Sequence, residues 1–269
     1  MNAKRALVTG AARGIGLAVA DALADTGTIV VRADIRPLAD EDHQVDVNDA
    51  GAVRALVEGC GPFDIVINNA GTVRRTSPTD PWEQAASDFD AVAGTNLRGA
   101  FLVGRAAVAG MIERGGGDIV NVLTDHVHTC GWPSPVDHSD AGDCPYAAAP
   151  RPPGGGPSMD VYDAGKWGLA GLTLSWAGAL ESQGIRVNGL CVGATETAML
   201  RSFLNSEPDP ALVASWLTPA EVASVVLDLL AEGPGGRTGD LIGVWPGHPV
   251  LLPRPGRFAG CSTASPSVQ

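Results

Sequence analysis

A glycine-rich turn near the start of the chain has the residue types and spacing of a phosphate-binding loop. Gly10, Gly14 and Gly16 follow the apolar run at 6–8 and precede a helical pattern of apolar residues. Glycines at such a turn let the backbone approach a pyrophosphate, which then lies on the amide N–H groups and positive dipole end of the following helix. The sequence therefore predicts a dinucleotide-binding turn.

A tyrosine and a lysine much later in the chain have the spacing of a proton-transfer pair. Tyr162 and Lys166 are four residues apart, so on a helix they share one face, and the ammonium can lower the pKa of the phenol towards working pH. Taken alone, such a pair is more often a packing tyrosine and a solvated lysine. Together with the glycine turn, in this order, the pair indicates a redox enzyme.

Short β-rich runs alternate with helical stretches along the chain, which predicts an α/β fold with a parallel sheet and helices on both faces. The first helix should run from Ile15 to Thr26 and end at Gly27, and a later helix should begin at Thr218 as N-cap with Pro219 at its first position. Six strands are expected, at Arg5–Thr9, Ile29–Ala33, Asp64–Asn68, Asp118–Leu123, Arg186–Leu190 and Leu241–Val244.

The connection after the second predicted strand is unusually short. Only eleven residues separate Asp34 from Asp46, too few for a full helical crossover. We therefore expect a loop or a single turn between the two aspartates.

Composition and charge exclude several function classes. The chain has 269 residues, a formal net charge of −12 and 45% hydrophobic residues, which is enough for one large domain. A phosphate backbone would be repelled by the negative charge, so no nucleic-acid partner is expected. No apolar run is long enough to span a bilayer, and five irregularly spaced cysteines suggest no disulfide framework. The sequence therefore predicts a cytoplasmic protein with no membrane partner.

Six motifs in this order resemble those of the short-chain dehydrogenase/reductase family, over roughly residues 5 to 247. They are Thr9-Gly10-x-x-x-Gly14-Ile15-Gly16, Asn68-Asn69-Ala70-Gly71, Asn96, Tyr162-x-x-x-Lys166, Arg186-Val187-Asn188 and Gly193-x-x-x-Thr197. The resemblance implies a single-domain Rossmann-type doubly wound sheet over residues 1–247, followed by a C-terminal tail at 248–269. It also implies a nicotinamide cofactor that carries a hydride.

The resemblance assigns the cofactor-binding residues. Gly10, Gly14 and Ile15 would line the pyrophosphate, Asp46 and Val47 would hold the adenine, and the other contacts would come from Arg13, Asn69, Ala70, Gly71, Tyr162, Lys166, Gly193, Thr195 and Thr197. Asp34, at the end of the second strand, would accept the ribose hydroxyls and repel a 2′-phosphate, which favours NAD. Arg13 and Arg36 could instead pair with a 2′-phosphate, so NADP is the less favoured alternative.

The implied mechanism interconverts a secondary alcohol and a ketone. Tyr162 would exchange the proton, Lys166 would hold the phenolate and the nicotinamide ribose, and Asn96 would anchor a water. Thr124 takes the place of the usual serine, and its hydroxyl can orient the substrate oxygen. Thr124 could instead be a packing residue, and Ser158 is then the alternative residue for the serine's role. A second departure is Val192, where the family more often has proline. Because of the serine replacement, a catalytically inactive dinucleotide-binding sensor or scaffold is the second functional hypothesis.

The segment at about 125–159 adds roughly two dozen residues to a connection that borders the substrate pocket in the family. It is expected to form a lid, with a solvated surface excursion as the alternative. It also concentrates possible zinc ligands, but their spacing fits no ordered zinc motif, so no metal is expected. These residues are His126, His128, Cys130, His138 and Cys144.

The expected partners are a small-molecule substrate and further copies of the chain. The substrate classes that fit are a small alcohol, a cyclic diol, a sugar or a steroid-like alcohol, and the acidic surface disfavours an acidic carrier protein. The predicted helix after Tyr162 carries more apolar residues than one sheet contact needs, which predicts a homodimer or homotetramer. These residues are Trp167, Leu169, Leu172, Leu174 and Trp176.

Overall fold

The computed structural model describes residues 3–37, 42–127, 159–204 and 207–244. Seven strands form one sheet in the order β3-β2-β1-β4-β5-β6-β7, and every neighbouring pair is parallel. The strands are β1 Arg5–Thr9, β2 Ile29–Asp34, β3 His43–Gln44, β4 Ile65–Asn68, β5 Gly117–Thr124, β6 Ile185–Val192 and β7 Leu241–Val244. The order reverses between β1 and β4, which is the place where doubly wound sheets bind ligands.

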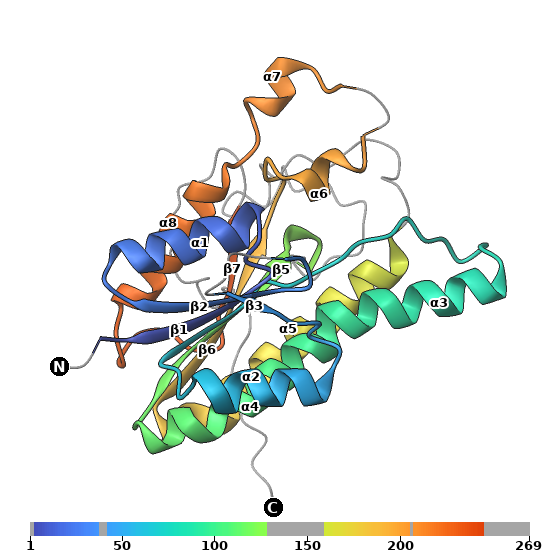
Figure 1. The fold of residues 1–269 in the computed structure, drawn as a ribbon. Helices are drawn as coiled ribbons and strands as arrows, with labels where there is room; N and C mark the ends of the chain where they lie inside the picture. The colour runs from blue at the N-terminus through green and yellow to red at the C-terminus, as the bar shows by residue number, and fades with distance from the viewer. Residues whose placement is uncertain (1–2, 38–41, 128–158, 205–206, 245–269) are drawn as a thin grey trace, which may run out of the picture.

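Helices cover both faces of the sheet (Figure 1). On one face, α1 (Gly14–Asp25) and α8 (Pro219–Ala231) pack over a cluster that includes Ala6 and Val8; on the other, Leu7 joins the cluster under α2 (Ala50–Cys60), α4 (Ala100–Glu113) and α5 (Asp160–Leu180). This alternation follows from the period of two residues along a strand. The predicted doubly wound α/β fold is confirmed.

The remaining described helices are shorter or lie towards the edges of the molecule. They are α3 (Trp82–Ala93), a π-helical turn at Gly94–Gly99, short 3₁₀ turns at Asp125–Val127 and Glu181–Gln183, α6 (Ala198–Arg201) and α7 (Pro210–Val213). No helix in the described parts of the chain is long and apolar enough to cross a membrane.

Local signals placed the helix ends well. Gly27 has a φ of +83°, which suits glycine, directly after the C-cap Thr26 of α1. At α8 the Thr218 side chain accepts from the backbone N–H of Glu221, whose carboxylate accepts from the N–H of Thr218. This is the capping box that satisfies two donors at a helix start.

The connection between β2 and the next helix differs in one respect from expectation. Residues 35–37 and 42–45 contain no helix, as predicted, but His43–Gln44 form the edge strand β3, which was not predicted. Two residues carry too little alternation to be recognised as a strand. The pairing of β3 with Ala33 and Asp34 nevertheless brings residues 45–47 to the carboxyl edge of the sheet.

Several sequence predictions concern residues outside those the structure describes. They are the lid hypothesis for the segment at about 125–159, Ser158, the possible zinc ligands other than His126, and the tail at 248–269. In the described residues, no three His, Cys, Asp or Glu side chains group as a metal site would require.

Candidate active site

The turn between β1 and α1 depends on glycine. Gly10 and Gly14 have φ values of +66° and +59°, and a Cβ on Gly16 would lie 2.2 Å from the carbonyl oxygen of Gly10. The N-cap of α1, Arg13, makes no side-chain capping bond. The N–H groups at the start of α1, which include that of Ile15, are therefore left for an anion, and this cradle fits a pyrophosphate.

Asp34 lies directly beside this turn. Its two carboxylate oxygens accept from the backbone N–H groups of Ala12 and Arg36, each at 3.0 Å, and the residue is 8% exposed. Each oxygen keeps a further lone pair, which can accept from a ribose hydroxyl. Arg13 and Arg36, the two candidates for binding a 2′-phosphate, are both exposed near the same edge.

The segment after β4 joins the turn to the predicted catalytic residues. Asn69 donates from Nδ2 to the carbonyls of Thr9 and Gly10, and Thr9 Oγ1 accepts from the N–H groups of Asn69 and Ala70. A Cβ on Gly71 would lie 3.4 Å from Asn96 Oδ1 and 3.8 Å from Lys166 Nζ. Three predicted site segments therefore meet here.

Asn96 lies in the π-helical turn between α3 and α4 and is 1% exposed. Its side chain accepts from the N–H of Thr72 at 2.8 Å and donates to the carbonyl of Thr72 at 2.9 Å. Such π-helical turns occur often at functional sites. Each side-chain atom keeps a further hydrogen-bonding position, because Oδ1 has a second lone pair and Nδ2 a second N–H, so the side chain can still bind a water.

The residues expected to bind the adenine and the nicotinamide pack against different parts of the chain. Val47 is buried against Gly99, while Asp46 is exposed and accepts from the N–H of Asn48. A Cβ on Gly14 would lie 3.4 Å from Thr197 Cγ2. Thr197 caps α6, and Thr195 donates to the carbonyl of Gly193 at 3.0 Å.

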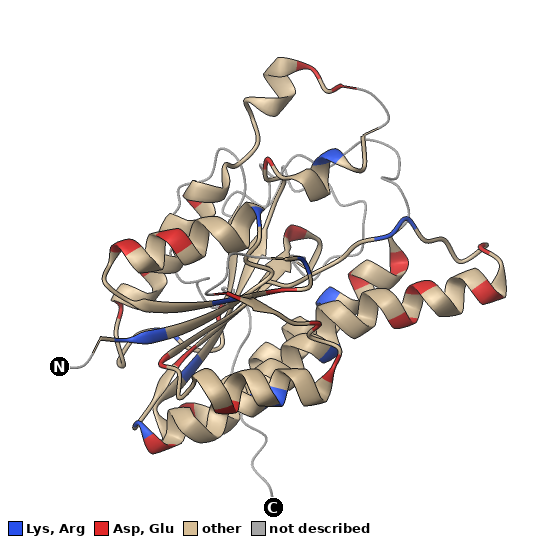
Figure 2. Cartoon of the chain, viewed as in Figure 1, with Lys and Arg blue, Asp and Glu red and all other residues tan. Residues whose placement is uncertain are grey.

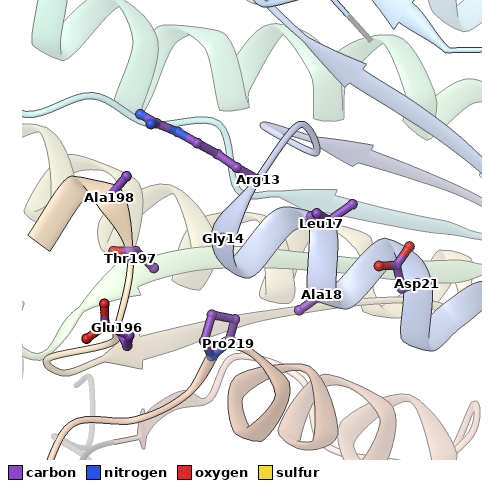
Figure 3. A pocket seen from close by; sticks show the side chains of 9 residues that line it. All are labelled: Arg13, Gly14, Leu17, Ala18, Asp21, Glu196, Thr197, Ala198 and Pro219. Carbon is purple, nitrogen blue, oxygen red and sulfur yellow. The ribbon is translucent and has the colours of Figure 1, made fainter. Parts of the chain in front are cut away.

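An open groove of about 410 Å³ lies between the start of α1 and the residues that lead into α6 (Figure 3). Arg13, Gly14 and Thr197 line one part of it, and Pro219 at the start of α8 lines another. The groove adjoins the glycine turn and leaves the N-terminus of α1 accessible.

Tyr162 and Thr124 are in contact at the carboxyl end of β5. Tyr162 lies in the first turn of α5 and Thr124 is the last residue of β5, which brings their hydroxyls close together. Burial raises the pKa of Tyr162 to about 12, the neighbouring Thr124 hydroxyl lowers it in part, and the charges of Asp125 and Asp163 raise it further. Thr124, which replaces the usual serine, is thus placed to act on the oxygen that Tyr162 would protonate.

Lys166 lies one turn along α5 and is 5% exposed. Its Nζ donates to the carbonyl of Val122 at 2.7 Å and lies 5.8 Å from the centroid of the Tyr162 ring. Burial lowers the pKa of Lys166 to about 8. The lowered phenol pKa that the helical spacing predicts is therefore not found: the ammonium is directed at a carbonyl, and desolvation dominates at the phenol.

Asp125, His126 and Asp163 lie beside Tyr162; the sequence indicated no role for the two aspartates and suggested His126 only as a possible zinc ligand, with no metal expected. Thr124 Oγ1 donates to Asp125 Oδ1 at 3.1 Å, and His126 Nδ1 lies 2.7 Å from Asp163 Oδ1. Burial raises the pKa of Asp125, whereas the bond to Asp163 raises the pKa of His126. The position of Asp163 next to Tyr162 was the one available signal in the sequence.

Comparison with known proteins identifies the family. A family model described as short chain dehydrogenase matches residues 4–129, and one described as enoyl-(acyl carrier protein) reductase matches residues 153–247. The chain is 30% identical over 266 residues to the 3-oxoacyl-(acyl-carrier-protein) reductase FabG of Thermotoga maritima, with 91% of this chain and 97% of that protein covered. The chain belongs to the short-chain dehydrogenase/reductase family.

Other members of the family are similar to comparable extents. The gluconate 5-dehydrogenase of Gluconobacter oxydans is 32% identical over 225 residues, with 77% of each chain covered. The crystal structure of levodione reductase superposes with a TM-score of 0.71 at 25% identity, over 90% of this chain and 96% of that one. The family predicted from the motifs is confirmed, and the chain is an oxidoreductase of the short-chain dehydrogenase/reductase family.

Proposed function

We propose that this short-chain dehydrogenase/reductase interconverts a secondary alcohol and a ketone with NAD as cofactor. The observation that carries the proposal is the contact between the Tyr162 and Thr124 hydroxyls, with Lys166 one helical turn away, at the sheet edge that holds the glycine turn. The nicotinamide, when bound, donates or accepts the hydride. The residues of the chain supply binding, orientation and proton transfer.

Each catalytic side chain has a separate task in this proposal. Tyr162 gives its hydroxyl proton to the ketone oxygen, or takes one from the alcohol, and the Thr124 hydroxyl orients that oxygen. Lys166 contributes a positive charge that stabilises the phenolate, which the buried site otherwise disfavours. Asn96 holds the loop at Thr72 in place through two hydrogen bonds.

The NAD preference rests on Asp34. A carboxylate beside the glycine turn accepts hydroxyls of an unmodified ribose and repels a 2′-phosphate. Asp34→Ala should lower the ratio of kcat/KM for NAD to kcat/KM for NADP by roughly 10- to 100-fold, the worth of a charged hydrogen bond. Steady-state kinetics with both cofactors measures this ratio.

Asp34→Asn is the matched control for that experiment. It keeps the size of the side chain and one oxygen that can accept from Ala12 or Arg36, while it removes the charge and replaces the other acceptor by an NH2 group. Thermal unfolding of both variants shows whether the turn is still supported, and an equal fall in the ratio for two variants of wild-type stability would assign the effect to the carboxylate's charge and acceptor atoms. Wild-type protein that already prefers NADP would mean that Arg13 and Arg36 outweigh Asp34.

The proposed substrate is a small molecule rather than a carrier-bound chain. Acidic residues lie along α1 and α3, and Lys and Arg are scattered among the described residues (Figure 2). With a net charge of −12, the surface would repel an acidic carrier protein. A relative such as gluconate 5-dehydrogenase, whose name refers to a small sugar acid, supports a small-molecule substrate, whereas FabG is named for a carrier-bound one.

A comparison of turnover with binding tests the proposed function. Purified protein should oxidise NADH, or NADPH, with members of a panel of cyclic and sugar ketones, and NADH fluorescence should report binding of the cofactor. Cofactor binding without turnover of any ketone or alcohol would instead favour a sensor or scaffold.

We also propose a homodimer or homotetramer. Trp167 and Leu174 on α5 are 47% and 50% exposed, and Phe101 on α4 is 41% exposed. A second copy that packed on this face would remove the apolar side chains from water. Light scattering at micromolar concentration should give at least twice the mass of the chain, and Leu174→Glu should lower that mass; a monomeric wild type would contradict the proposal.

A further inference from the structure

A histidine and an aspartate join the two elements that carry the catalytic hydroxyls. His126 follows Thr124 by two residues in the turn after β5, and Asp163 follows Tyr162 directly on α5. Their side chains meet at 2.7 Å, and the His126 ring stands edge-on to the Tyr162 ring with 6.3 Å between centroids. The pair therefore lies beside Tyr162, the residue proposed to exchange the proton.

The contact with Asp163 uses one of the two imidazole nitrogens. Asp163 accepts from Nδ1 and so fixes the orientation of the ring, which leaves Nε2 as a second polar atom. The His126 side chain is 41% exposed, so a ligand can approach the ring. An apolar substrate that covered Nε2 would leave it without a partner, and this costs free energy.

The charges around the pair favour a neutral ligand oxygen over a carboxylate. Asp125 and Asp163 face His126, and Lys166 lies one turn beyond Tyr162. Two potential negative charges thus balance two potential positive charges, so the cluster offers no net attraction for an anion. The net charge of −12 on the whole chain disfavours an anionic substrate further.

We propose that His126, oriented by Asp163, binds a second, neutral oxygen of the substrate, so that the preferred substrates are vicinal diols and the matching α-hydroxy ketones. The inference rests on the proposed function, because it places the reacting oxygen at Tyr162 and Thr124. A substituent on the carbon next to the reacting carbon is the part of a substrate best placed to reach a group beside Tyr162.

A pair of matched ligands tests this without any need for turnover. Dissociation constants of trans-1,2-cyclohexanediol and cyclohexanol are measured on the protein–NADH complex by the change in NADH fluorescence. The diol should bind about tenfold or more tightly than the monoalcohol, as one hydrogen bond to a charged or polar group predicts. Since binding is measured directly, a protein that preferred the diol but turned nothing over would contradict the proposed function, while recognition of the second oxygen by His126 would still be supported.

Two substitutions separate recognition by Nε2 from the contact between His126 and Asp163. In His126→Asn, the amide nitrogen takes the place of Nδ1 and can still donate to Asp163, but nothing replaces Nε2. In His126→Gln, the amide reaches towards the position of Nε2 and gives up the contact with Asp163. We expect His126→Asn to bind the diol and cyclohexanol with about equal affinity, and its affinity for cyclohexanol should stay within a few-fold of the wild type.

Thermal unfolding of each variant shows whether it is folded. An unchanged diol preference in a folded His126→Asn would overturn the proposal, and so would equal affinities of the wild type for the two alcohols. If 2-hydroxycyclohexanecarboxylate bound more tightly than the diol, the neutral substrate class would be wrong. Retention of part of the preference in His126→Gln, together with its loss in His126→Asn, would support recognition through Nε2.

Discussion

Tyr162→Phe is expected to lower kcat by about 10²- to 10⁴-fold, the usual contribution of a positioned general acid or base. The substitution keeps the buried ring and removes the one proton that the proposed mechanism transfers. The affinity for NAD should stay within a few-fold, because the pyrophosphate and ribose contacts lie at the glycine turn and Asp34. Steady-state kinetics together with NADH fluorescence titration measures both quantities.

Substitutions of Thr124 provide the control for this result. Thr124→Ser keeps the hydroxyl and should retain most of the activity, whereas Thr124→Val keeps the shape and should lose most of it. If Tyr162→Phe turned over at nearly the wild-type rate, the assigned mechanism would be wrong. Normal turnover in Thr124→Val alone would remove Thr124 from the mechanism and return attention to Ser158.

Lys166→Met is expected to have opposite effects on activity and on stability. Activity should fall by about 10²-fold or more, since the charge that favours the phenolate is lost. In the folded protein the pKa of Lys166 is lowered to about 8 from 10.5, and each pKa unit is worth about 1.4 kcal/mol, so the buried ammonium costs roughly 3 kcal/mol at neutral pH. After the lost bond to Val122 is subtracted, the free energy of unfolding should rise by about 1–2 kcal/mol.

The dependence of this gain on pH follows from proton binding. Between pH 8 and 10.5 the unfolded chain holds the Lys166 proton that the folded protein has released, so the stability of the wild type rises with pH in that window. The advantage of Lys166→Met over the wild type should therefore shrink as pH rises. Urea unfolding at pH 7 and pH 10 without nucleotide measures this advantage. A destabilised Lys166→Met at pH 7 would contradict the assigned cost of burial.

The sequence was informative about the fold wherever a local rule decided the outcome. The strand at Arg5–Thr9 and the capping box at Thr218 both follow from patterns within a few residues of each other. Strand β3 was not predicted because its two residues form a strand only by pairing with β2, and this pairing is a tertiary contact that no local pattern indicates. The π-helical turn at Gly94–Gly99 likewise has no local signature that separates it from the helices on either side.

The candidate site was predictable as a set of residues but less so as an electrostatic environment. The helical spacing placed Tyr162 and Lys166 on one face, yet the direction of the lysine towards Val122 depends on where β5 ends. The pairing of His126 with Asp163 joins residues 37 positions apart in the chain. A sequence motif names such residues one by one, whereas their pKa values depend on burial and on partners from other elements.

The burial of Lys166 also has a practical consequence for chemical labelling. Lysine acylation requires a reagent to reach an unprotonated amine, and Lys166 is 5% exposed with its Nζ bonded to the carbonyl of Val122. Lys4, the other lysine of the chain, is exposed just before β1 begins, at the end of that strand opposite the glycine turn. An N-hydroxysuccinimide ester directed at lysine side chains should therefore attach a fluorophore or a solid support at Lys4 and leave the amine of Lys166 unmodified. A support attached there would leave the groove facing the solution.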